Sequence, residues 1–188
     1  MALLMKICLL GDGSVGKTSL INRYLGKGFP SAYTPTLGTD FHSKEVSLGF
    51  RFQKKDIRFQ IWDLAGQPAF EQVRKVYYHG SVGALLVFDL TRPDSFRNIE
   101  RWVMEFSKNI GLPNSSIVVL GNKMDLKNEV KISAETVKQY IIDNLDNKYS
   151  NIDNGIKYFE TSAKTGENVE RAFSVLGRKI ISRFEEDS

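Results

Sequence analysis

A segment near the N-terminus has the residue types and the spacing of a phosphate-binding loop. Residues 11–18 read GDGSVGKT and match the pattern G-x-x-x-x-G-K-[S/T] at every fixed position. Glycines allow backbone N–H groups to curl around phosphate oxygens, Lys17 can reach the outer phosphates, and the Thr18 hydroxyl is a hard oxygen ligand of the kind that Mg²⁺ prefers. The segment predicts a nucleotide-binding site; the alternative is a glycine turn that matches by chance.

The sequence around this loop predicts the elements that must hold it. The apolar run 3–10, interrupted only by Lys6, is typical of a buried strand in a parallel sheet, and residues 19–25 have helical spacing until Gly26. The loop would then join a strand to a helix N-terminus, where the helix dipole adds partial positive charge. This context favours an anion site over a chance turn.

Strands and helices alternate along the rest of the chain. Helical spacing is found within 93–106, 133–145 and 169–184, and a turn near 53–55 is expected to join two strands into a hairpin. The alternation indicates an α/β protein with a mostly parallel central sheet, one antiparallel edge strand and helices on both faces. The expected strands are 3–10, 41–50, 56–62, 82–88, 117–120 and 156–160.

Two further polar segments follow expected strands as the phosphate loop does. They are DLAGQ at 63–67 and NKMD at 122–125. In open parallel sheets, ligands bind beyond the carboxyl ends of the strands. We therefore expect both segments and the phosphate loop at one edge of the sheet.

Composition limits the classes of protein. A length of 188 residues fits one domain, 1–188, and no apolar run approaches the ~20 residues of a membrane span. The net charge is +4, but there is no basic stripe with interleaved aromatics, so we expect no nucleic-acid partner. Lys54 and Lys55 are assigned to the hairpin turn, and the single cysteine, Cys8, to a buried strand position in a reducing compartment.

The chain shows no lipidation signal. Position 2 is Ala2, where N-myristoylation needs glycine, and 184–188 is acidic and lacks cysteine. We therefore expect no intrinsic membrane anchor in this chain. The expected location is cytoplasmic, with peripheral membrane contact through partners or a C-terminal tail that is missing here.

Taken in order, the polar segments resemble the motif set of the small Ras-superfamily GTPases. The matching segments are the phosphate loop 11–18, Thr36, 63–67, 122–125 and TSAK at 161–164. The resemblance covers nearly the whole chain and implies a three-layer P-loop GTPase fold with about six strands.

Within that superfamily the chain most resembles the Rab branch. The residues that carry this likeness are TLGTDF at 36–41, Trp62 before the aspartate, and Tyr77 with Tyr78. The likeness implies a GTP-binding molecular switch in vesicle trafficking or signalling.

The chemistry of Asp125, as well as the family resemblance, predicts selectivity for guanine. The Asp125 carboxylate can accept hydrogen bonds from N1–H and the exocyclic amine of guanine, and adenine has no matching donor pair. The resemblance implies that Asn122 holds either the N7/O6 edge or the neighbouring loop, that Lys123 packs over the ring, and that Ala163 donates its N–H to O6. Phe29 either covers the guanine edge or is an ordinary hydrophobic anchor. The implied nucleotide-binding residues are Gly11, Asp12, Gly13, Ser14, Val15, Gly16, Lys17, Thr18, Ser19, Phe29, Thr36, Asp63, Gly66, Asn122, Lys123, Asp125, Ser162, Ala163 and Lys164.

The implied cofactor is Mg²⁺, with GTP or GDP as the ligand. Thr18 and Thr36 would bind the metal directly and Asp63 through water, while Gly66 would donate its N–H to the terminal phosphate. Loss of that phosphate would release two switch loops, about 30–40 and 66–77.

Gln67 is the implied catalytic residue, because its position in the motif is the one that orients the attacking water. The reaction would be Mg²⁺-dependent hydrolysis of GTP to GDP and phosphate. The sequence marks no built-in arginine finger, so hydrolysis should be slow without an activating partner.

Effectors, exchange factors and GTPase-activating proteins are the implied partners, through the switch loops and three aromatics. Phe41, Trp62 and Tyr77 resemble the aromatic triad of Rab-type switches. Partly buried packing is the alternative, and the two interpretations can coexist.

The sequence also departs from the family pattern. Segments 49–56 and 143–155 look longer than usual, the latter as a polar connection, and Pro68–Ala69 replaces the charged pair that usually follows the glutamine. A GTP-binding scaffold with negligible hydrolysis and a P-loop ATPase or kinase are the rival functions. Intact Gln67 and Thr36 argue against the first, and 122–125 argues against the second.

Base recognition gives a first test. Asp125→Asn should lose GTP and gain xanthosine triphosphate, whose 2-oxo group needs a donor. Loss of the charged hydrogen-bond pair should weaken GTP binding roughly a hundredfold or more, which titration with both nucleotides would measure. Unchanged GTP affinity would contradict the role of Asp125.

Overall fold

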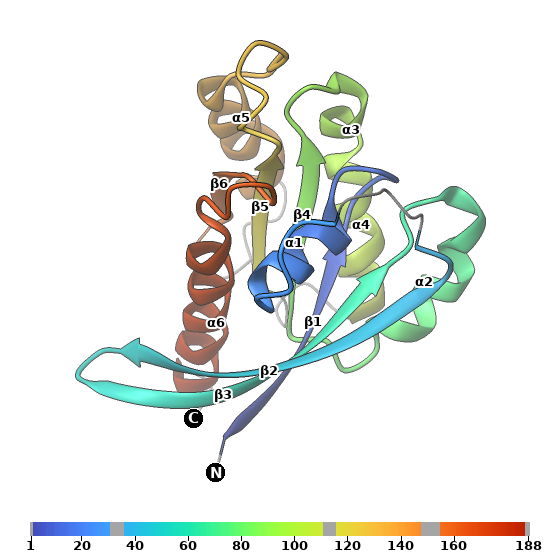
Figure 1. The fold of residues 1–188 in the computed structure, drawn as a ribbon. Coiled ribbons are helices and arrows are strands. Elements are labelled where there is room, and N and C mark those ends of the chain that lie inside the picture. The colour runs from blue at the N-terminus through green and yellow to red at the C-terminus, as the bar shows by residue number, and fades with distance from the viewer. Residues whose placement is uncertain (1, 31–35, 111–115, 148–154, 187–188) are drawn as a thin grey trace.

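The sheet is the centre of the structure (Figure 1). The computed structural model describes residues 2–30, 36–110, 116–147 and 155–186. Six strands run in the order β2-β3-β1-β4-β5-β6; β2 pairs with β3 antiparallel, and all the other pairs are parallel. This confirms the predicted α/β class with an antiparallel edge strand. The strands are β1 (Leu3–Leu10), β2 (Thr39–Phe50), β3 (Gln53–Leu64), β4 (Gly83–Asp89), β5 (Ser116–Asn122) and β6 (Lys157–Thr161).

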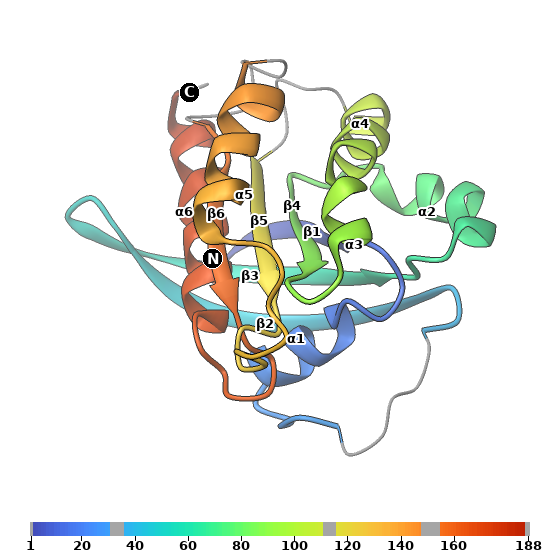
Figure 2. The same cartoon turned by 90° about the horizontal axis from the view of Figure 1, so that it is seen from above.

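Helices cover both faces of this sheet (Figure 2). On one face α1 (Lys17–Tyr24) and α6 (Val169–Glu186) pack against the strands. On the other face lie α2 (Glu71–Tyr78), α3 (Pro93–Arg97), α4 (Ile99–Ile110) and α5 (Ala134–Tyr140), with the short η1 (Pro68–Phe70) before α2 and the π-helical η3 (Ile141–Asp146) after α5. Among the described helices, none has the length and apolar character that a bilayer span requires.

The central strands are apolar on both sides because each side faces a helix layer. In β1, Ile7 and Leu9 join the core under α1 and α6, whereas Cys8 and Leu10 join the core under α4 and α5. The period of two explains the continuous apolar run 3–10. Cys8 is fully buried, and burial raises the pKa of its thiol to about 11.

The hairpin turn lies earlier in the chain than the sequence predicted. Phe50 pairs with Gln53, so the turn consists of Arg51 and Phe52, and Arg51 has a left-handed φ of 52°. The predicted turn at 53–55 is therefore wrong. Nothing in the sequence marks this turn, because neither residue is the Gly, Asn or Asp that usually tolerates positive φ. Lys55 lies within β3 and forms an ion pair with Glu185 of α6.

Two helical predictions also need correction. Part of the polar connection 143–155 is helical, because η3 continues α5 as far as Asp146. Phe70, Val73 and Val76 have weak helical spacing in the sequence, but in α2 Val73 and Val76 are 41% and 73% exposed, whereas Arg74 and Tyr78 are buried. The face of α2 that packs on α4 is set by a polar partner, Glu105, which hydrophobic periodicity does not detect.

Close packing of α6 on the hairpin gives a test of the fold. A Cβ at Gly177 would lie 2.5 Å from Cδ1 of Leu48 and 3.0 Å from Cζ of Phe59. Gly177→Leu should lower the free energy of unfolding by about 1–3 kcal/mol through overpacking, as measured by urea denaturation. Arg171→Leu, at an exposed position of the same helix, is the control and should stay within about 0.5 kcal/mol. Equal midpoints for Gly177→Leu and the wild type would contradict this packing.

Candidate functional site

A cavity of about 700 Å³ lies where the loops after β1, β3, β5 and β6 meet. Its volume is within the range of small-ligand sites. The structure therefore brings most of the predicted site residues around one cavity. Those that line it are Gly13, Ser14, Gly16, Lys17, Thr18, Ser19, Phe29, Thr36, Gly66, Gln67, Asn122, Lys123, Asp125, Ala163 and Lys164. Pro30, at the start of the predicted switch loop 30–40, lines it as well, and so do Asn22 and Leu126, which the sequence did not single out.

Lys17 lies over the phosphate loop rather than in solvent. Its Nζ donates to the carbonyl oxygens of Gly11 (2.8 Å) and Asp12 (2.9 Å), and the residue is only 7% exposed. Burial lowers its pKa to about 8, although Asp63 and Asp12 act in the opposite direction. Anionic oxygens in the cavity would favour its charged form.

Three oxygen-bearing side chains converge beside Lys17. The Thr18 hydroxyl is 2.9 Å from the Thr36 hydroxyl and donates to Oδ2 of Asp63. Asp63 is fully buried and its Oδ1 has no hydrogen-bond partner. Burial raises the pKa of Asp63, while the Thr18 hydrogen bond and Lys17 lower it. An unpartnered buried carboxylate oxygen beside two hydroxyls fits a hard cation.

The same residues limit how a cation would be held. No group of three or more His, Cys, Asp or Glu side chains within the described ranges could hold a metal ion. A cation beside Asp63 would therefore take its remaining ligands from water and from phosphate oxygens of a nucleotide. Mg²⁺ binds in this way, through few protein ligands and substrate phosphates.

Gly66 packs directly on the phosphate loop. A Cβ there would lie 2.3 Å from the Gly11 oxygen, 2.4 Å from the Asp12 carbonyl carbon and 2.6 Å from the Gly13 nitrogen. Only glycine allows this approach. Beside it, Oε1 of Gln67 is buried and has no hydrogen-bond partner, so it can accept a hydrogen bond from a ligand in the cavity.

The opposite end of the cavity is organised by Asn122. Its Nδ2 donates to the Val15 oxygen (2.9 Å), and its Oδ1 accepts from the Ala163 N–H (3.2 Å) and the Thr161 hydroxyl (3.3 Å). Of the two roles that the resemblance implied for Asn122, these contacts match the one that holds neighbouring loops. The amide joins β5 to both the phosphate loop and the loop after β6.

Asp125 presents its carboxylate to the cavity from the same loop. Its Oδ1 accepts a hydrogen bond from the Ser162 hydroxyl (2.6 Å), and that hydroxyl in turn accepts from the Thr165 N–H (3.0 Å). These hydrogen bonds fix the orientation of the carboxylate at the cavity. Lys123 has a left-handed φ of 72°, and its Nζ pairs with Oδ2 of Asp89 at 2.6 Å.

Some predicted residues lie behind the cavity. Val15, Asp63 and Ser162 are fully buried beneath its wall. The Asp12 side chain turns away from the cavity and accepts hydrogen bonds from Trp102 and Asn98 at the start of α4. Residues 31–35 of the first predicted switch loop lie outside the described residues.

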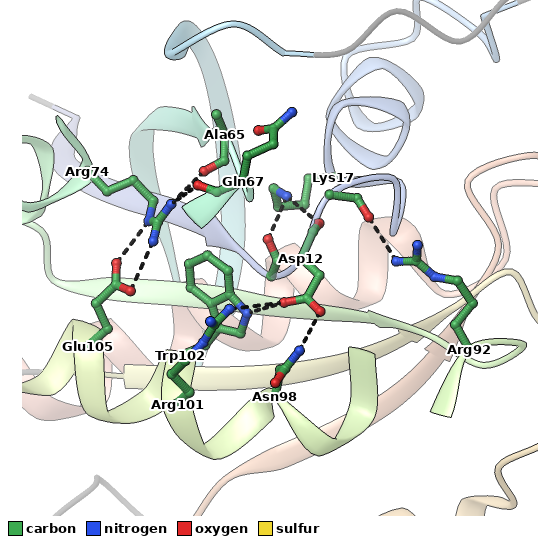
Figure 3. Close-up of polar contacts among 12 residues, drawn as sticks. Asp12, Lys17, Ala65, Gln67, Arg74, Arg92, Asn98, Arg101, Trp102 and Glu105 are labelled. Carbon is green, nitrogen blue, oxygen red and sulfur yellow. Dashed lines mark hydrogen bonds and ion pairs between the residues drawn. The ribbon is translucent and has the colours of Figure 1, made fainter. Parts of the chain in front are cut away.

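Three arginines brace the site, and the sequence did not predict them. Nε of Arg23 donates to the Ala163 oxygen (2.9 Å). Figure 3 shows the other two: Nη2 of Arg92 donates to the Gly13 oxygen (2.8 Å), and Nη1 of Arg74 donates to the Gln67 oxygen (3.0 Å). Arg23 and Arg92 contact loops that are 140 and 79 residues away, whereas Arg74 contacts the loop that precedes its own helix, seven residues away. No local pattern could have identified them, because the contacts depend on tertiary packing.

The three aromatics of the predicted triad form one cluster on β2, β3 and α2. Phe41 and Trp62 have ring centroids 5.1 Å apart, and Trp62 and Tyr77 are 4.9 Å apart. Phe41 is 46% exposed. The rings therefore pack against one another and also present apolar surface next to the cavity.

Comparison with known proteins gives a consistent result. A sequence model described as "Ras family" matches residues 6–182. The chain is 40% identical to "Ras-related protein Rab7" of Drosophila melanogaster over 181 residues, which cover 95% of the chain and 81% of that relative. It is 38% identical to "Ras-related protein Rab-13" of Bos taurus (95% and 80% covered) and 36% identical to "Ras-related protein Rab-8B" of Pongo abelii (96% and 80%).

The close approach of Gly66 gives a test of the site. In Gly66→Ala the added methyl group would meet backbone atoms of the phosphate loop, so the loop after β3 could not close on a terminal phosphate. We expect GTP affinity to fall relative to GDP affinity by the equivalent of about 1–3 kcal/mol, or roughly 5- to 150-fold. Competition between fluorescent GTP and GDP would measure the ratio. Gly49→Ala, where a Cβ meets nothing within 4 Å, is the control; an unchanged ratio in Gly66→Ala would contradict the role of Gly66.

Proposed function

The chain belongs to the Ras family of small GTPases, and from this premise we propose how its residues bind GTP, hydrolyse it and pass on the change. As a member of this family it is a GTP-binding molecular switch and a GTPase that converts GTP to GDP and phosphate. Its Rab relatives place it in the Rab branch. The residue roles below are our proposal.

One observation carries the proposal: the cavity has two chemically different ends. Lys17, Thr18 and Gly66 line one end, and Asp125 and Ala163 line the other. The first end offers the Lys17 ammonium group, the Thr18 hydroxyl and backbone N–H groups, all of which can bind phosphates. The second offers a carboxylate acceptor and a backbone donor, which match the Watson–Crick edge and O6 of guanine. We propose that a guanine nucleotide lies along the cavity between these ends.

We propose Mg²⁺ as the cofactor on the basis of the donors beside Lys17. Thr18 and Thr36 would hold it through their hydroxyls, and Asp63 through water. Mg²⁺, when bound, would offset charge on the phosphates. Thr36 can join this arrangement only when its loop is closed, as its 2.9 Å contact with Thr18 requires.

For hydrolysis, we propose that Gln67 orients the attacking water through its unpartnered Oε1. Lys17 and the Gly66 N–H would stabilise charge on the terminal phosphate. Phosphoryl transfer depends on such positioning and charge stabilisation rather than on covalent chemistry of the protein. An activating partner would supply the arginine finger that the sequence does not mark in this chain.

The two loops next to the phosphate contact each other, which supports a switch. The Ala65 N–H donates to the Gly38 oxygen (2.9 Å), so the loops before β2 and after β3 close together. Loss of the terminal phosphate would remove the group that the Gly66 loop binds and would weaken the contact of the Thr36 loop with Mg²⁺. We propose that this rearrangement alters the surface around Phe41, Trp62 and Tyr77, and that effectors, exchange factors and activating proteins bind there.

The wider role is also proposed. We take residues 1–188 as one GTPase domain that serves Rab-type vesicle trafficking or signalling. The cytoplasm, with peripheral contact to membranes through partners, is the location that we propose.

The catalytic role of Gln67 is directly testable. Single-turnover hydrolysis by the wild type should be slow, on the order of 10⁻⁴ to 10⁻² s⁻¹, and an arginine supplied by an activator should raise it ~10³- to 10⁵-fold. Gln67→Leu should slow the reaction further without a change in GTP affinity, and the activator should not rescue it. A wild-type rate in Gln67→Leu would show that another group places the water.

A further inference from the structure

A partly buried hydrogen-bond network connects the phosphate loop to the loop that carries Gln67. Figure 3 shows its members between α2, α4 and the two loops. At the phosphate loop, the Asp12 carboxylate accepts from Nε1 of Trp102 (2.8 Å) and Nδ2 of Asn98 (2.7 Å). Trp102 is 1% exposed and the Asp12 side chain is 20% exposed, so this contact is partly buried.

Arg74 lies over the ring of the same indole. Its guanidinium carbon is 4.6 Å from the centre of the Trp102 ring, and the residue is 2% exposed. Nε and Nη2 donate to the two carboxylate oxygens of Glu105 at 2.9 and 3.0 Å, and Tyr78 donates to the same carboxylate (2.6 Å). The guanidinium is therefore fixed by an ion pair and by a ring.

The remaining nitrogen of this fork, Nη1, reaches the loop after β3. It donates to the carbonyl oxygens of Ala65 and Gln67, both at 3.0 Å. These carbonyls lie on either side of Gly66. One guanidinium thus holds the Ala65–Gly66 and Gln67–Pro68 peptide groups, which flank the Gly66–Gln67 peptide in the loop that faces the terminal phosphate.

Peptide geometry turns this contact into a constraint on direction. In a trans peptide the C=O and the following N–H lie in one plane and point in opposite directions. Because Arg74 binds the Ala65 oxygen, the Gly66 N–H must point away from the guanidinium, and Gly66 itself packs on the phosphate loop. The hydrogen bond from Arg74 to the Gln67 oxygen likewise restricts the backbone conformation of Gln67, and so the position of its side chain.

We propose that Arg74 is a positioning residue for GTP hydrolysis, and that Trp102 links it to Asp12 so that the phosphate loop and the Gln67 loop are held in register. This inference rests on the proposed roles of Gly66 and Gln67. Arginine suits the task because its planar fork can bind a carboxylate, two carbonyls and a ring face at once, whereas lysine offers a single ammonium.

A purely structural role, in which Arg74 only fastens α2 to α4, makes a different prediction. Loss of this contact between α2 and α4 would lower the free energy of unfolding, the nucleotide affinity and the hydrolysis rate together. Loss of positioning would lower the hydrolysis rate while both nucleotides still bind, because the groups that hold the base and the inner phosphates lie in other loops.

Two substitutions separate parts of the network. Arg74→Lys keeps the charge beside Glu105 but removes the fork. Trp102→Phe keeps a ring beneath Arg74 and leaves the Arg74–Glu105 pair in place, but removes the N–H that binds Asp12. The control is Arg171→Lys, an exposed arginine of α6 far from the network.

Each variant would be measured for single-turnover hydrolysis of preloaded GTP, for GTP and GDP affinity, and for thermal unfolding. We expect a rate at least about tenfold lower in Arg74→Lys, because misplacement of reacting groups by about 1 Å can cost ~10²-fold. Trp102→Phe should lose roughly three- to tenfold. GDP affinity should stay within about twofold, and GTP affinity should fall by a smaller factor than the hydrolysis rate. Since the residues act in series, the double variant should be about as slow as Arg74→Lys alone rather than slower by the product of both effects.

The outcomes that overturn the proposal are distinct. Wild-type rates in Arg74→Lys and Trp102→Phe, with a slow Gln67→Leu, would overturn this inference alone. Rates that fall only in proportion to affinity and stability would assign the network a structural role and overturn it too. A wild-type rate in Gln67→Leu would remove the proposed function of Gln67, and this inference with it. If Arg74→Lys does not fold, Trp102→Phe decides the question.

Discussion

The buried amide of Asn122 is the interaction on which the site depends. Its two ends bond to the phosphate loop at Val15 and to the loop after β6 at Ala163. Both contacts are fully buried, so neither polar group could be left unpaired without cost. The amide therefore fixes the distance between the two ends of the cavity, one suited to phosphates and the other to a base. A nucleotide must match that distance.

The phosphate loop is held by Lys17 from within and by side chains of other segments from outside. A glycine-rich segment loses much conformational entropy on ordering and has few side chains of its own to order it. Here Asn122 binds the Val15 oxygen, Arg92 binds the Gly13 oxygen, and Trp102 binds Asp12. The loop is thus held by β5, by the segment before α3 and by α4. Its shape is set before a ligand arrives, which lowers the entropic cost of binding.

Helix α2 shows how one polar contact serves two surfaces. Arg74 turns one face of the helix inward to Glu105 and Trp102, and this leaves Val73 and Val76 exposed on the other face. Exposed Leu37 and Phe41 also belong to the segments beside the cavity. Exposed apolar side chains that gather on one surface mark a candidate interaction site for partner proteins. The contact that orients the Gln67 loop is therefore also the one that presents this surface.

The sequence by itself determined the parts whose chemistry and spacing are local. The phosphate loop 11–18, the strand before it and the segments 63–67 and 122–125 were predictable because each is a continuous run after an apolar strand, and parallel strands bring such runs to one edge. Only the tertiary structure decided which side chains brace that edge. Asp12 and Trp102 are 90 residues apart, and Arg74 and Glu105 are 31 apart. No periodic pattern encodes such pairs; they form only when the packing of α2 and α4 brings them together.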